Sequence, residues 1–105
     1  MHSSSYQKSV AAAQKLLSGK YTILILNELT DGSKNYNTLL KSLDITSPTL
    51  TRSLKEMEEH HLIRRVVLPS SPVRVEYSLT TLGEEFRSSL ECLSAWGAFS
   101  LSEKT

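Results

Sequence analysis

The chain has little cysteine and no long apolar segment, and each shortage excludes a class of protein. The single thiol, Cys92, cannot form an intramolecular disulfide, which favours a reducing compartment. No apolar run exceeds four residues, far below the roughly 20 that a membrane-spanning helix needs. The first residues, MHSSSYQK, also lack the apolar core of a signal peptide. We therefore expect a cytoplasmic protein that does not enter the membrane.

Charge of one sign is not in excess, and no catalytic motif is present. The 12 Lys and Arg residues nearly balance the 11 Asp and Glu residues, for a net charge of +1, which permits nucleic-acid contact without requiring it. No nucleophile–His–acid pattern, phosphate-binding loop or paired-cysteine spacing occurs. His60 and His61 are adjacent at a predicted helix end, so their side chains point apart. We expect no enzyme activity, no cofactor and no metal site.

The 105 residues form an ordinary globular mixture, with 39% hydrophobic and 22% charged side chains. This length predicts a single domain over residues 1–105. Its core is modest, so a partner subunit would add stability, and a large catalytic cavity is not expected.

Hydrophobic periodicity divides the chain into four helices, a hairpin and a long last helix. The predicted helices cover residues 7–17, 20–29, 38–43 and 47–60, and the predicted strands cover 62–68 and 73–79. Asn37 is expected to cap the third helix, with Tyr36 packed on its first turn, and Thr46 or Ser47 to cap the fourth. A capping box at 81–84 is expected to open the last helix.

A short helix, a three-residue turn, a longer helix and a two-stranded wing make a winged helix-turn-helix. The expected fold class is therefore α+β, mainly α, with N- and C-terminal dimerisation helices flanking the winged domain.

The fourth predicted helix is the one that a helix-turn-helix inserts into the major groove of DNA. Its apolar positions Leu50, Leu54 and Met57 face inward. The side chains left facing outward are Ser47, Thr49, Thr51, Arg52 and Lys55. Short hydroxyls allow close approach, and Arg52 could bind guanine bidentately or clamp a phosphate. The alternative is an ordinary solvated helix face.

Arginines on the predicted wing form a second candidate contact with DNA. Arg74 follows a loop that two prolines stiffen, and Arg64 and Arg65 lie on the opposing strand. Wing arginines can reach the minor groove or flanking phosphates. Alternatively, Arg74 pairs with a nearby carboxylate such as Glu76.

The last predicted helix is apolar on two sides. The stripe expected to hold it on its own domain consists of Leu82, Phe86, Leu90 and Leu93. A second stripe, turned to another side, consists of Cys92, Ala95, Trp96 and Phe99. We interpret the second stripe as a homodimer interface to which Tyr6 and Val10 contribute, because so short a chain has few elements left to cover it. The alternative is a helix wedged between two elements of its own subunit.

Several segments resemble a known family of regulators. GKYTILIL at residues 19–26 is similar to the family's GKWTLLIL opening, and VEYSLTTLG at 75–83 resembles its wing and last-helix start. Further matching positions are Ile45, Thr46, Leu50, Thr51, Leu54, Glu58, Leu62, Ile63, Arg65 and Pro72. Over about residues 10–97 the chain thus resembles the HxlR-type winged-helix regulators of bacteria, relatives of the MarR type.

The resemblance implies a homodimer that binds a pseudo-palindromic operator and represses or activates adjacent genes, with dimer contacts from the first and last helices. Carried over by position, DNA contact falls on Ser47, Pro48, Thr49, Thr51, Arg52, Lys55, Arg65 and Arg74. We therefore expect a bacterial, sequence-specific DNA-binding transcriptional regulator, in the first instance a repressor. A small-molecule effector could bind between the dimerising helices and the winged domain, although no residue identifies it.

Three positions depart from the family pattern. Tyr21 replaces the usual Trp, which is expected only to repack the core. His61 stands where Gly usually ends the recognition helix, so it must tolerate a left-handed backbone. Lys8 or Ser9 occupies the place of the cysteine with which many members sense oxidants, so no thiol switch is carried over to Cys92.

An alternative hypothesis is a winged-helix protein-interaction module without DNA binding. The near-neutral net charge is its best support, because a fold does not fix a function. In that case, substitutions of Arg52 or Arg74 would leave function unchanged.

Overall fold

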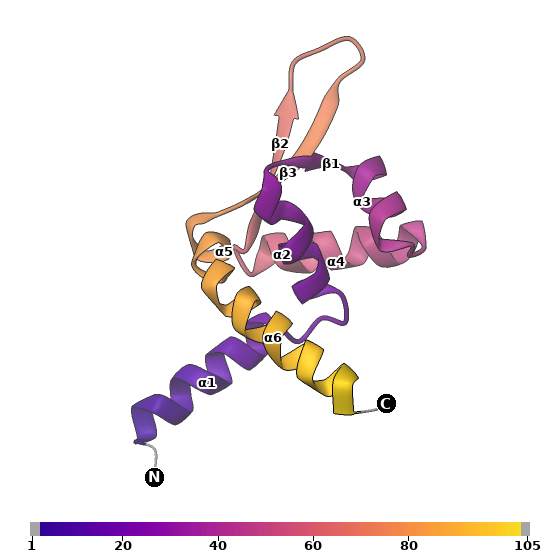
Figure 1. Ribbon diagram of the computed structural model, residues 1–105. Helices are drawn as coiled ribbons and strands as arrows, with labels where there is room; N and C mark the ends of the chain where they lie inside the picture. Colours follow the sequence, from indigo (N-terminus) through magenta and orange to yellow (C-terminus); the bar gives the residue numbers. More distant parts are fainter. Residues whose placement is uncertain (1–2, 104–105) are drawn as a thin grey trace.

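The computed structural model describes residues 3–103 and contains the predicted winged helix-turn-helix (Figure 1). The elements in chain order are α1 (Ser4–Leu16), α2 (Thr22–Glu28), the 3-10 helix η1 (Leu29–Asp31), β1 (Lys34–Asn35), α3 (Tyr36–Leu43), α4 (Ser47–Glu59), β2 (Ile63–Leu68), β3 (Arg74–Leu79), α5 (Thr81–Glu85) and α6 (Arg87–Glu103). α3 and α4 form the helix-turn-helix, and β2 and β3 form the wing, so the expected fold class is confirmed.

The core lies where α2, α3 and α4 meet the sheet. Its buried side chains are Ile25, Leu26, Leu29, Leu39, Leu50, Leu54, Met57, Leu62, Ile63, Tyr77 and Leu79. The inward face of α4 is the predicted one, since Leu50, Leu54 and Met57 are at most 2% exposed. Their spacing of four and then three positions places them on one side of the helix. The other side of α4 is left to solvent.

The wing is part of a three-stranded antiparallel sheet in the order β1-β3-β2. β2 pairs with β3 along its whole length, and β1 adds Lys34 opposite Tyr77. The predicted two-stranded wing is correct for the hairpin but misses β1, whose two residues are too few to show an alternating pattern. Val73, expected in the strand, lies in the wing loop and is 62% exposed.

Side-chain caps explain where the first helices begin, and they correct two predicted boundaries. Ser3 caps α1, which therefore begins earlier than expected. Asn35 Oδ1 accepts a hydrogen bond from the Thr38 amide at 2.8 Å, so the cap of α3 is Asn35, and Asn37 lies inside the helix. Thr46 caps α4, one of the two predicted residues. α2 is shorter than expected, because residues 18–21 form a turn and the chain tightens into η1 after Glu28.

The predicted long last helix is broken into α5 and α6. Its cap is Thr80 rather than Thr81, since Thr80 Oγ1 accepts a hydrogen bond from the Gly83 amide at 3.1 Å. The same oxygen donates to the His61 carbonyl at 2.6 Å, which ties the start of α5 to the turn after α4. Phe86 separates α5 from α6. The break allows α6 to leave the domain in a new direction.

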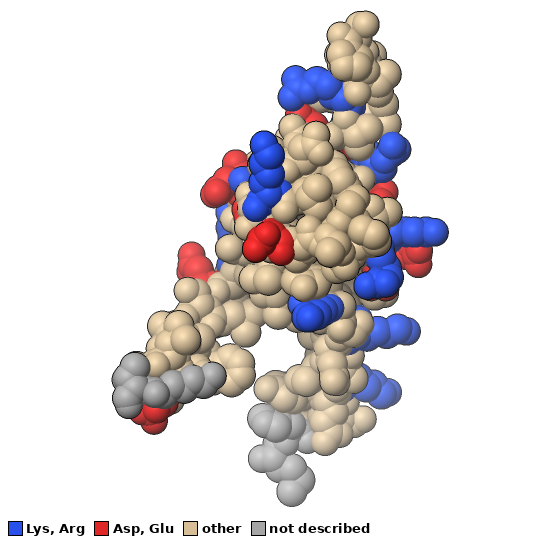
Figure 2. Space-filling model, turned by 90° about the vertical axis from the view of Figure 1, so that its right-hand side faces the viewer, with Lys and Arg blue, Asp and Glu red and all other residues tan. Residues whose placement is uncertain are grey.

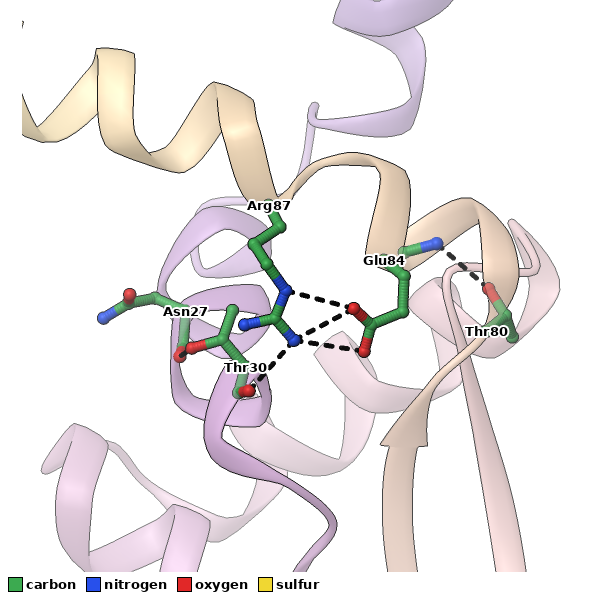
Figure 3. Close-up of polar contacts among 6 residues, drawn as sticks. Asn27, Thr30, Thr80, Glu84 and Arg87 are labelled. Carbon is green, nitrogen blue, oxygen red and sulfur yellow. Dashed lines mark hydrogen bonds and ion pairs between the residues drawn. The ribbon is translucent and has the colours of Figure 1, made fainter.

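Arg87 holds the start of α6 against the turn that follows α2 (Figure 3). Its guanidinium donates to both carboxylate oxygens of Glu84, with nitrogen–oxygen distances between 2.9 and 3.2 Å, and to the Thr30 carbonyl at 3.0 Å. Thr30 is fixed in turn, because its hydroxyl donates to the Asn27 carbonyl at 2.7 Å. These contacts join three elements at the point where α6 begins.

α1 and α6 project from the winged domain as two arms (Figures 1 and 2). Neither helix contains a buried residue. The radius of gyration is 15.6 Å, against about 13 Å for a compact domain of this length. The accessible surface is 7614 Å², whereas a compact monomer of 11.7 kDa has about 5,900 Å². The isolated chain therefore exposes roughly 1,700 Å² more surface than a compact monomer of the same mass.

His61 adopts the left-handed backbone conformation expected at the end of α4, with φ of 59°. This conformation costs a non-glycine residue about 1–2 kcal/mol. His61→Gly is therefore expected to raise the free energy of unfolding by about 0.5–1 kcal/mol, since the added freedom of the unfolded chain offsets part of the gain. Thermal unfolding at a fixed protomer concentration should show Tm higher by several degrees.

The matched control is His61→Ala, which removes the imidazole but keeps a Cβ and therefore the strain. It should not stabilise the protein. Equal stabilisation by alanine and glycine would assign the effect to loss of the imidazole and contradict the backbone argument.

Candidate nucleic-acid interface

One tyrosine, at the first position of α3, connects α3 to the start of α4. The Tyr36 hydroxyl donates to the Ser47 carbonyl at 3.0 Å and lies 3.0 Å from the Thr51 hydroxyl. The hydrogen bond with the Ser47 side chain, followed by that with Thr51, lowers the pKa of Tyr36. This polar role is not predictable from the sequence, because nothing in the local pattern shows that partners 11 and 15 positions away come within reach.

The hydroxyl-bearing residues predicted to contact DNA are already engaged within the protein. Ser47 and Thr51 face Tyr36 on the side of α4 that is nearer α3. Thr49 is half-buried, and its hydroxyl accepts a hydrogen bond from Thr46 at 2.8 Å. These side chains therefore fix the geometry of the α3–α4 unit, and their oxygens keep further lone pairs for an outside donor.

The outermost face of α4 carries two cations. Arg52 and Lys55 are exposed, as is Pro48 in the first turn. Within residues 3–103, neither Arg52 nor Lys55 forms an ion pair. Both charges are therefore available to an external anion.

The wing carries arginines at both ends of the hairpin, with Arg65 near its base and Arg74 in the last strand pair before the loop. Arg74 forms an ion pair with Glu76 at 3.2 Å, which is the alternative considered from the sequence. Glu76 also accepts a hydrogen bond from the Ser33 hydroxyl at 3.0 Å. The Arg74 side chain stays 59% exposed, and an exposed pair contributes about 1 kcal/mol or less, so this pair is readily exchanged for a phosphate.

Arg65 lies on β2 directly opposite Tyr77 on β3. Burial raises the pKa of Tyr77, and a hydrogen bond with Arg65 acts in the opposite direction. Basic side chains are spread over the body and along the wing, whereas the loop at the wing tip, residues 69–73, carries none (Figure 2). Any charged contact by the wing therefore comes from its strands.

The second apolar stripe is exposed in the isolated chain. Trp96 is 71% exposed and Phe99 63%, and Cys92 and Ala95 are also exposed. Tyr6 and Val10 on α1 are 50% and 52% exposed. No element of the described chain buries the stripe, so the wedged-helix alternative is not what the protomer adopts.

The first apolar stripe of the last predicted helix packs on its own domain only in part. Phe86, Leu90 and Leu93 are half-buried, but Leu82 is 43% exposed. Leu82 lines an apolar hollow of about 160 Å³ between the end of α1 and α5, together with Leu16, Leu17, Leu62 and Phe86.

Among residues 3–103, no group of three or more His, Cys, Asp or Glu side chains is placed to hold a metal ion. No helix in that part of the chain has the length and apolar character needed to cross a membrane.

The α3–α4 unit, the hairpin and the flanking helices define a winged helix-turn-helix protein. The chain belongs to the HxlR-like helix-turn-helix family, whose model matches residues 16–105. It is 36% identical over 99 residues to the HTH-type transcriptional regulator YtcD of Bacillus subtilis, covering 93% of this chain and 79% of YtcD. Together these similarities identify the chain as a transcriptional regulator of the helix-turn-helix type.

Solved structures agree with this assignment. A crystal structure of the regulator ytcD superposes with a TM-score of 0.83 at 35% identity, covering 89% of this chain and 96% of that one. The redox regulator HypR in its reduced form gives a TM-score of 0.82 at 27% identity, covering 92% of this chain and 99% of HypR. The resemblance inferred from the sequence is thereby confirmed.

Proposed function

We propose that this regulator binds double-stranded DNA as a homodimer and represses the genes beside a pseudo-palindromic operator. The main support is the outer face of α4, where Arg52 and Lys55 are exposed and form no ion pair within residues 3–103. Family membership supports the same conclusion.

In the proposed complex, α4 lies in the major groove with its first turn toward the base edges. Arg52 can donate two parallel hydrogen bonds to guanine, and Lys55 can neutralise a phosphate. Ser47, Thr49 and Thr51 line the approach with short side chains. Arg65 near the base of the wing and Arg74 beside its loop contact the backbone or the adjacent minor groove.

The dimer is supported by the surplus of surface and by its chemistry. Roughly 1,700 Å² of surface in excess of a compact monomer exceeds the ~800 Å² that each partner buries in a standard interface. Trp96 and Phe99 on α6 and Tyr6 and Val10 on α1 supply the aromatic and apolar side chains that such interfaces favour. Two copies related by a two-fold axis would present two α4 helices to successive major grooves, about one helical turn apart.

An effector site is proposed at the apolar hollow beside Leu82. It lies between α1, one of the two proposed dimerising helices, and α5 of the winged domain, the general region in which an effector could bind. Its apolar lining favours a small apolar molecule, and its modest volume limits the size of that molecule.

Recovery of bound fragments from sheared DNA of the source organism tests the function directly. Enrichment of a two-fold symmetric site would support the regulator, and the adjacent genes would identify what it controls. Recovery without sequence preference would leave only electrostatic binding. No recovery at low salt would favour the protein-interaction module instead.

Arg52→Ala is expected to weaken operator binding by about 1–3 kcal/mol and to relax discrimination at one base pair, because a bidentate guanine contact is lost. Competition binding with operators substituted at single positions measures both effects. Lys15→Ala on the exposed part of α1, outside the helix-turn-helix and the wing, is the control for loss of one positive charge. A uniform loss of affinity over all sequences would contradict base reading and assign Arg52 to a phosphate.

A further inference from the structure

A polar hollow of about 470 Å³ lies between the α1–α2 turn and one side of α4. One wall is the turn at residues 18–21, and the other wall is formed by Thr49, Arg52, Ser53 and Glu56. This side of α4 is opposite the side that faces Tyr36 through Ser47 and Thr51. The hollow therefore lies beside the proposed recognition surface, on the flank away from α3.

The charges around the hollow suit a single anion. Lys20 and Arg52 contribute two cations and Glu56 one carboxylate, so the lining carries one net positive charge at neutral pH. The Lys20 ammonium lies 5.4 Å from the centre of the Tyr21 ring, over which it is held by a cation–π contact. Within residues 3–103 Lys20 takes part in no ion pair, so its charge is available.

Gly19 allows the turn to close tightly on the first residue of α2. A Cβ at this position would lie 2.5 Å from Thr22 Oγ1 and 3.5 Å from Glu56 Oε2. The absence of a side chain thus leaves room for the Thr22 hydroxyl against the turn, and the adjacent Lys20 lines the hollow.

We propose that this hollow receives one phosphodiester group of the DNA backbone, held by Lys20, when α4 enters the major groove. The inference rests on the proposed function and adds a contact outside the helix-turn-helix and the wing. A helix in the major groove has a sugar-phosphate strand on each flank, and the hollow occupies one flank of α4. One phosphodiester carries a single negative charge, and Lys20 supplies the cation for it, because Arg52 is engaged with guanine in the proposed complex. Lys20 thereby fixes the position of α4 along the groove without reading sequence.

The test measures the salt dependence of binding to a fluorescein-labelled 30-base-pair duplex of arbitrary sequence, by fluorescence anisotropy. Lys20→Gln is expected to lower the slope of log K against log salt concentration by about 1, because one phosphate contact is lost. Lys8→Gln, an equal change of charge on the exposed face of α1, is the matched control and should keep the wild-type slope. Glu56→Gln is expected to tighten binding by roughly two- to fivefold, because it removes the carboxylate that repels the phosphate.

The outcomes separate this inference from the proposed function. If wild type binds the duplex and Lys20→Gln has the same slope as Lys8→Gln, the phosphate contact is overturned. If inorganic phosphate then raises the Tm of wild type but not of Lys20→Gln, the hollow is a site for a free anion instead. If wild type binds no duplex even at low salt, the proposed function fails, and the phosphate contact fails with it. Unchanged Tm values for all three variants establish that any difference comes from binding.

Discussion

Gly83→Ala is expected to lower the free energy of unfolding by about 3 kcal/mol. Gly83 is buried in α5, where this helix crosses the start of the wing. A Cβ there would overlap the Leu62 carbonyl oxygen and would lie 3.1 Å from a methyl carbon of Leu79. The obstacle is backbone, which cannot turn aside as a flexible side chain does, so α5 must move away from β2.

Thermal unfolding at a fixed protomer concentration measures this effect, and Tm should fall by roughly 12–24 °C. Gly97→Ala is the matched control, because a Cβ at that position of α6 meets no atom within 4 Å. The control is expected to unfold at the wild-type temperature or a few degrees higher, since alanine favours the helix. If Gly83→Ala unfolds together with Gly97→Ala, the close packing of α5 on Leu62 does not govern stability.

Introducing charge on the exposed stripe of α6, with Trp96→Glu and Phe99→Glu together, is expected to convert the proposed dimer to monomers. Both side chains are more than 60% exposed in the protomer and would be buried against a second copy. Two unpaired carboxylates in an apolar interface are costly enough to prevent association. Operator affinity should fall at least 100-fold, because a monomer loses the linkage between two half-sites.

Sedimentation and operator titration measure the two effects on the same samples. The matched control is Trp96→Phe with Phe99→Leu, which keeps the stripe apolar and should remain dimeric. The glutamate variant should keep the secondary structure and Tm of a folded winged domain. A glutamate variant that stays dimeric would show that this stripe is not the interface.

The winged helix-turn-helix was predictable because its main signals are local. Leu50, Leu54 and Met57 give the buried face of α4 from spacing alone, and all three are buried. The positions of α4, β2 and β3 follow from the change of period after His61. The left-handed conformation of His61 was also expected from its place after the recognition helix, and its φ of 59° confirms it.

The features that the sequence did not predict depend on contacts between distant segments. β1 forms because Lys34 pairs with Tyr77 across the sheet. A two-residue strand is too short for its sequence to predict this pairing. Asn35 and Asn37 are equally good caps by residue type, and tertiary packing decides between them. At the break after α5, Arg87 reaches the Thr30 carbonyl, 57 positions away in the sequence. Local pattern contains none of this information.

The candidate contact surface was predictable in part. Arg52 and Lys55 are exposed on α4 as expected, whereas the hydroxyls of Ser47 and Thr51 are engaged by Tyr36. Lys20 escaped prediction because it lies outside the helix-turn-helix in sequence, and only the fold brings it beside α4.

The Arg87 contacts have a geometric consequence for operator choice. If two copies join through α6, the angle between α6 and the winged domain determines how far apart the two α4 helices stand. One guanidinium, through Glu84 and the Thr30 carbonyl, holds that angle. Arg87 would then fix the distance between the two α4 helices, which must match one turn of the double helix.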